Sequence, residues 1–127
     1  MKFEWQQGLI WVSLTVIYGR STIIIPDCII DTGSKTTMID IDWVEFDYQK
    51  PAIIKRLFGI GTGTQEVLCQ QVNKVIIEQF ELETVDIEFG TIKEHLGING
   101  FIGTDILERF ILTIDFKKQF IDFTLNQ

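Results

Sequence analysis

The segment 9–31 is rich in isoleucine, valine and other apolar residues, and it is interrupted at Gly19-Arg20 and at Pro26. Residues of this kind favour strands, and a glycine between two apolar runs is typical of a hairpin turn. Pro26 lacks an amide hydrogen, so it should either interrupt the strand or place this part of it at the edge of the sheet. We therefore expect a hairpin followed by a short, nearly all-apolar strand, at residues 9–18, 21–25 and 27–31.

The third of these strands ends in the sequence Asp31-Thr32-Gly33-Ser34. Gly33 permits a sharp turn, and the hydroxyl groups on either side of it can hydrogen-bond the carboxylate or the nearby backbone. A rigidly held acid at the end of a buried strand suits catalysis. The same residues also suit an ordinary Asx-type turn, so this stretch alone leaves both interpretations open.

The remaining chain also reads mostly as strands. Residues 83–89 alternate strictly between apolar and polar side chains, which predicts a half-buried strand. Residues 66–71 and 74–81 are expected to pair around Val72-Asn73. Residues 38–48 fit either a strand and loop or one irregular helical turn, and residues 52–58 fit either helix or strand. Near the C-terminus we expect a short helix at 91–96 and a closing hairpin formed by residues 111–116 and 119–125.

Two further stretches carry glycines in informative places. The first is Gly59-Ile60-Gly61-Thr62-Gly63, which lacks the following helix that a phosphate-binding loop needs. A mobile lid or a surface turn beside strands fits it better. The second is Phe101-Ile102-Gly103, a short apolar strand that should lead into a helix capped by Thr104 or Asp105.

Composition limits the classes of protein. A chain of 127 residues with 46% hydrophobic and 23% charged residues fits one globular domain, residues 1–127. The net charge of −7 argues against a nucleic-acid partner. No apolar run is long enough to span a membrane, and the first residues do not resemble a signal peptide, so we expect a cytoplasmic protein. Two cysteines and one histidine predict neither a disulfide scaffold nor a multi-histidine metal site, and we expect no cofactor.

Taken together, these motifs resemble the retropepsin-like aspartic proteases, the single-lobe enzymes of the retroviral type. The resemblance rests on Ile29-Ile30-Asp31-Thr32-Gly33-Ser34, on the glycine-rich residues 59–63, and on Phe101-Ile102-Gly103 before a short helix and a final hairpin. It covers most of the chain, from about residue 21 to residue 125. Agreement of the motifs in order and spacing favours the fold.

The resemblance implies a mostly β, closed barrel with one short C-terminal helix and one lobe per chain. It implies that Asp31 is the catalytic acid, that Thr32 hydrogen-bonds across a subunit interface, and that Gly33 contacts the substrate backbone. Ser34 would hydrogen-bond the Asp31 carboxylate. Phe101, Ile102 and Gly103 would cross beneath the active loop. Gly59, Ile60, Gly61, Thr62 and Gly63 would lie on or beside a flap over the substrate.

Peptide hydrolysis of this kind needs two carboxylates in unlike protonation states, and aspartic proteases are the standard example. The chain has one Asp-Thr-Gly, and Asp40, Asp105 and Asp115 lack the Thr-Gly that follows Asp31. The second acid is therefore expected from a second copy of the chain, in a two-fold symmetric homodimer acting on an extended peptide or protein.

The sequence departs from the retroviral pattern beside both motifs. Retroviral members usually carry an acid after Asp-Thr-Gly-Ser/Ala and an arginine after the later glycine, whereas this chain has Lys35 and Thr104 there, with Asp105 next. Either Lys35 and Asp105 form a pair of reversed polarity or both are solvated. Three functions compete: an active homodimeric endopeptidase, a catalytically silent dimerisation or peptide-binding module, and a fragment of a larger processing factor.

Overall fold

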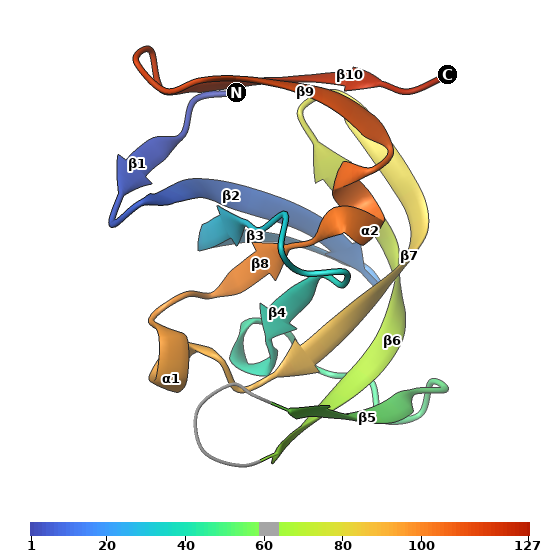
Figure 1. Ribbon diagram of the computed structural model, residues 1–127. Helices are drawn as coiled ribbons and strands as arrows, with labels where there is room; N and C mark the ends of the chain where they lie inside the picture. Colours follow the sequence, from blue (N-terminus) through green and yellow to red (C-terminus); the bar gives the residue numbers. More distant parts are fainter. Residues whose placement is uncertain (59–63) are drawn as a thin grey trace.

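The computed structural model describes residues 1–58 and 64–127, and the protein is built mostly of strands (Figure 1). The elements are β1 (Glu4–Gln6), β2 (Leu9–Tyr18), β3 (Ser21–Ile30), β4 (Met38–Asp40), the 3-10 turn η1 (Ile41–Trp43), β5 (Ile53–Phe58), β6 (Thr64–Ile77), β7 (Phe80–Gly90), α1 (Lys93–Leu96), β8 (Gly100–Ile102), α2 (Thr104–Leu107), β9 (Phe110–Asp115) and β10 (Phe120–Leu125). The predicted fold class, mostly β with a short helix near the C-terminus, is confirmed.

The strands close on themselves. One sheet has the order β1-β2-β3-β8-β4-β7-β6-β5, and an additional pairing of β2 with β6 joins β2, β3, β8, β4, β7 and β6 into a ring. Strands β9 and β10 form a separate two-stranded sheet, which lies above the ring in Figure 1 beside the N-terminus. Leu14, Val16, Ile25, Val75, Ile87, Ile106 and Ile121 are among the fully buried residues of the core.

Strands β2 and β3 form the predicted hairpin, but β3 continues through Pro26 instead of breaking there. The register shifts where Leu14 pairs with Ile25 and Val12 with Cys28. Asp27 takes up the extra residue with a left-handed φ of 55°. The local irregularity is therefore a β-bulge, which absorbs the proline without ending the strand.

The turn predicted at Val72-Asn73 is wrong. Strand β6 runs unbroken to Ile77, and the hairpin turns at Glu78-Gln79, because Ile77 pairs with Phe80. The Asn73 side chain accepts a hydrogen bond from the Gly19 amide at 2.8 Å instead of forming a turn of its own.

The segments whose structure the sequence left open are now assigned. Residues 53–58 form strand β5, and residues 38–43 combine both alternatives as β4 followed by η1. The predicted short helix at 91–96 is the single turn α1, and the closing hairpin is β9–β10. None of the described helices is long and apolar enough to cross a membrane.

Candidate functional site

Asp31 directly follows β3, which lies between β2 and β8 in the ring. Strand β3 pairs in parallel with β8, with Ile30 opposite Ile102. The Asp31 amide continues this pairing and donates to the Ile102 carbonyl at 2.9 Å. Strand β8 also pairs with β4, so it lies between the two strands that the Asp31 loop, residues 31–37, connects. The backbone of Asp31 is therefore fixed by buried strands.

The loop turns back on the Asp31 carboxylate. The Gly33 amide donates to Asp31 Oδ1 at 3.0 Å, and the Ser34 amide donates to the Asp31 carbonyl at 3.2 Å. Asp31 is half-buried, while Thr32 and Gly33 are exposed. The Asp31 carboxylate is thus held by the Gly33 amide and remains partly accessible to solvent.

Ser34 makes a different hydrogen bond from the one that the resemblance implies. Its Oγ donates to the Thr36 carbonyl at 2.8 Å and accepts from the Thr36 amide at 3.3 Å. The Ser34 hydroxyl therefore stabilises the turn of the loop in the single chain, and it is not engaged with the Asp31 carboxylate.

Gly103 packs directly under the loop. A Cβ on this residue would overlap the Thr36 carbonyl oxygen and would come within 2.7 Å of the Ser34 carbonyl oxygen. The Thr104 amide donates to the same Ser34 carbonyl at 2.7 Å. Only a residue without a side chain permits this approach. Phe101 and Ile102, the two other residues predicted for this place, are both buried in β8.

A fully buried threonine ties the loop to helix α2. Thr37 Oγ1 donates to Asp105 Oδ1 at 2.7 Å and accepts from the Gly103 amide at 3.0 Å. The Thr37 amide donates to Asp105 Oδ2 at 3.2 Å. Asp105 is thus bound to Thr37, and the ion pairs of residues 1–58 and 64–127 do not include one between Lys35 and Asp105. The predicted side-chain cap of α2 is also absent, since Gly103 occupies the N-cap.

An apolar pocket of about 390 Å³ opens beside the Asp31 carboxylate. Five apolar side chains, together with Asp31, Gly33 and Ser34, line it: Leu9, Ile29, Leu96, Ile98 and Phe101. A concave apolar site with a few polar groups is the usual form of a ligand pocket. The resemblance implied that Phe101 lies beneath the Asp31 loop, but the sequence gave no signal for Leu9, Leu96 or Ile98, which come from elements far apart in the chain.

Asp40 holds the segment that carries one wall of this pocket. Its buried carboxylate accepts from the Ile92 amide at 3.0 Å, the Lys93 amide at 2.9 Å and the Asp42 amide at 2.9 Å. Burial disfavours the charged form, but these hydrogen bonds outweigh it and hold the pKa of Asp40 below its ordinary value. Because Lys93 begins α1, the carboxylate fixes the turn that ends at Leu96.

The other acids that could have served as a second catalytic group are engaged elsewhere. Asp40 is occupied by backbone amides and Asp105 by Thr37, as described above. Asp115 Oδ1 accepts from the Lys118 amide at 3.0 Å, in the turn between β9 and β10. Within residues 1–58 and 64–127, no group of three or more His, Cys, Asp or Glu side chains is arranged to hold a metal ion.

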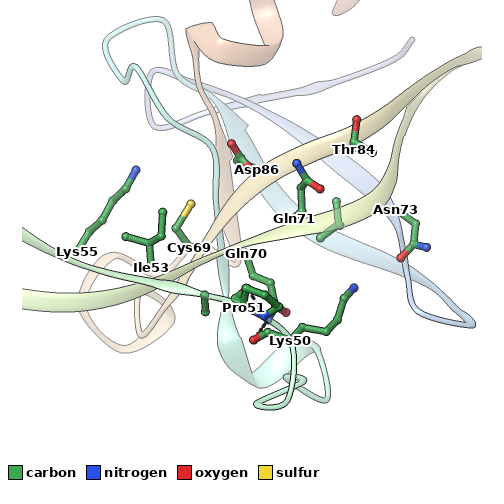
Figure 2. A pocket seen from close by; sticks show the side chains of 12 residues that line it. Lys50, Pro51, Ile53, Lys55, Cys69, Gln70, Gln71, Asn73, Thr84 and Asp86 are labelled. Carbon is green, nitrogen blue, oxygen red and sulfur yellow. Dashed lines mark hydrogen bonds between the residues drawn. The ribbon is translucent and has the colours of Figure 1, made fainter.

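A second pocket, of about 480 Å³, shares no lining residue with the first and lies on the face formed by β5, β6 and β7 (Figure 2). Its lining includes Lys55, Cys69, Gln71 and Asp86. Cys69 is buried, and burial raises the pKa of its thiol. The five residues Gly59, Ile60, Gly61, Thr62 and Gly63, predicted as a flap, lie between β5 and β6 and outside the described residues.

Comparison of the sequence with protein-family models gives no match, and comparison with curated proteins gives none. Comparison of the fold with solved structures does give a match. The structure is similar to the crystal structure of a retropepsin-like aspartic protease from Rickettsia conorii, with a TM-score of 0.64 and 21% sequence identity. The similarity covers 92% of this chain and 83% of that chain. This protein therefore has the retropepsin-like fold.

Proposed function

We propose that the protein is a homodimeric aspartic endopeptidase in which each chain supplies one Asp31. The observation that carries the proposal is the position of this carboxylate. It is fixed at a strand end, open to solvent on one side, and borders an apolar pocket. The retropepsin-like fold supports the same reaction class, because the fold of that name is known from an aspartic protease.

The reaction follows from two carboxylates sharing one proton. The ionised Asp31 takes a proton from a water molecule, and the oxygen of that water attacks the peptide carbonyl carbon. The protonated Asp31 of the second copy donates its proton to the carbonyl oxygen, which gives a neutral tetrahedral diol. The first Asp31, now protonated, then donates its proton to the amide nitrogen, while the ionised Asp31 of the second copy takes a proton from a diol hydroxyl. The carbon–nitrogen bond breaks and gives a carboxylic acid and an amine. A single chain offers one such acid, since its other candidate carboxylates are engaged.

The remaining loop residues would serve substrate and partner. Thr32 is exposed and would hydrogen-bond its counterpart beneath the paired acids, and Gly33 would contact the substrate backbone. Ser34 would hold the turn of the loop through Thr36. The pocket beside Asp31 suits one apolar side chain next to the scissile bond. The substrate is accordingly an extended peptide that is apolar at this position.

The test is cleavage of a peptide library by the wild type and by Asp31→Asn. Asn has nearly the same shape but cannot ionise, so the variant should keep its fold and lose hydrolysis. Cleavage that survives in pure Asp31→Asn protein rules out Asp31 as the catalytic acid. Binding of library peptides by the wild type without any cleavage would instead identify a silent peptide-binding module.

A further inference from the structure

Glu88 is a buried carboxylate that the proposed reaction does not use. It lies in β7, and only 2% of its surface is exposed. Its Oε1 accepts a hydrogen bond from Thr36 Oγ1 at 2.7 Å, and its amide donates to the Thr37 carbonyl at 3.0 Å. A buried carboxylate needs hydrogen-bonding or charged partners to replace its lost hydration, and the Asp31 loop supplies the first of them.

Strand β5 supplies the second partner of the Glu88 carboxylate. Lys55 Nζ lies 3.5 Å from Glu88 Oε2, and the lysine side chain is 42% exposed. In Figure 2 the lysine rises from β5 on the same side of the sheet as the Cys69 sulfur and Asp86. Cys69 stands between the two strands, since it pairs with Ile53 of β5 and with Glu88 of β7. Lys55 therefore reaches across β6 to Glu88.

These contacts form a continuous link from β5 to the catalytic loop. Lys55 contacts Glu88, Glu88 contacts Thr36, and Thr36 is bonded in both directions to the Ser34 hydroxyl. The Ser34 amide in turn donates to the Asp31 carbonyl. Strand β5 and the Asp31 loop do not pair with each other in the sheet, so this side-chain link joins two elements that the backbone leaves separate.

We propose that Glu88 is a positioning residue that couples the position of strand β5 to the Asp31 loop through Lys55 and Thr36. Its effect on catalysis rests on the proposed function, whereas the coupling itself does not. A substrate bound between β5 and the loop would find both elements already held in one arrangement. Removing either arm of the link should therefore weaken substrate binding more than it slows the chemical step.

The matched pair of variants is Lys55→Met and Arg56→Met. Each removes one positive charge from β5, and each leaves an acid without its partner. Among the residues that the structure describes, Arg56 forms an ion pair only with the exposed Glu66, at 3.6 Å, and the two side chains are 70% and 61% exposed. Thr36→Val removes the opposite arm of the link at nearly constant volume, and Thr36→Ser restores the hydroxyl group.

The first measurement is backbone amide exchange in the inactive Asp31→Asn background, so that it does not depend on activity. Lys55→Met should speed exchange in the loop 31–37, and Thr36→Val should speed exchange in β5. Arg56→Met and Thr36→Ser should leave the distant element unchanged. The coupling is disproved if each variant changes exchange only around its own residue, whatever happens to global stability.

The second measurement is steady-state cleavage by the otherwise wild-type dimer. Lys55→Met should raise KM roughly three- to fivefold with little change in kcat, the range expected for one partly exposed ion pair. Thr36→Val removes a hydrogen bond to the same buried carboxylate and should raise KM at least as much. The KM of the double variant should be close to that of the more severe single variant, because both substitutions act through Glu88. Additive effects would show that Lys55 and Thr36 act independently, and would overturn the proposal. Absence of cleavage in the wild type would instead count against the proposed function alone.

Discussion

Gly103 and Thr36 are in backbone contact so close that a single Cβ on Gly103 would overlap the Thr36 carbonyl oxygen. This contact joins the turn before α2 to the loop that carries Asp31. The two residues are far apart in the chain, and neither contact partner is the flexible end of a side chain. The position of the Asp31 loop therefore depends on the absence of one methyl group.

The first prediction concerns this contact. Gly103→Ala should lower the free energy of unfolding by about 1–3 kcal/mol or more, because the backbone has to move to admit the new carbon. Gly33→Ala is the matched control, since its Cβ would approach only Asp31 Oδ1, at 3.3 Å. Urea unfolding of both variants makes the comparison. Equal stability losses would show that the Gly103 contact is not specially tight.

The second prediction concerns the buried hydroxyl of Thr37. Thr37→Val leaves the Gly103 amide and the Asp105 carboxylate each short of one hydrogen bond. Such losses cost about 1–3 kcal/mol for a buried polar group. Thr37→Ser keeps the hydroxyl and loses only a methyl group, so it should be less destabilising. Chemical denaturation of the two variants decides the matter, and a valine variant as stable as the serine variant would contradict the role of the hydroxyl.

The third prediction is a pH dependence of stability that belongs to Asp40. Hydrogen bonds hold the folded-state pKa of Asp40 below its ordinary value of about 4, so the carboxylate stabilises the fold above that value. This contribution is lost as the pH falls through the folded-state pKa. Asp40→Asn should therefore be less stable at neutral pH and lose less stability on acidification. Thermal unfolding of the wild type and of Asp40→Asn between pH 7 and pH 3 measures this difference. If the stability of both proteins changes in parallel with pH, the role of Asp40 is disproved.

The fourth prediction concerns Cys28. Burial, with a smaller effect of the neighbouring Asp27 charge, raises the pKa of the Cys28 thiol to about 12. Because the thiolate is the reactive form, the native protein should not react with iodoacetamide at Cys28 at pH 8. Peptide mapping by mass spectrometry identifies the modified residue. The same treatment in denaturant should label it, and rapid labelling of the native protein would show that β3 opens easily.

The fifth prediction tests the proposed homodimer, in which each chain supplies one Asp31. Wild-type chains mixed with an excess of Asp31→Ala chains should lose activity, because mixed dimers contain one acid. With free exchange, active dimers fall as the square of the wild-type fraction. Dilution should also lower specific activity as the dimer dissociates. Constant activity per wild-type chain, with exchange demonstrated, would mean that one chain suffices for hydrolysis.

Much of the local structure followed from the sequence. The β-branched runs and Gly19 predicted the β2–β3 hairpin, and the Asp-Thr-Gly-Ser sequence at a strand end predicted where the Asp31 loop begins. In β7, alternation correctly placed Val85, Ile87 and Phe89 on the buried face. These features depend on neighbouring residues, whose preferences act within a few positions of the chain.

The tertiary structure decided which segments meet. Glu88 belongs to the polar side of the same alternating strand, yet it is buried because Thr36 and Lys55 cover it from other parts of the chain. Likewise, β6 passes Asn73 without turning because β2 and β7 offer partners on both sides. The bond between Thr37 and Asp105 also depends on β8 lying between β3 and β4. Such contacts join residues distant in the sequence, and their geometry exists only once the ring has closed.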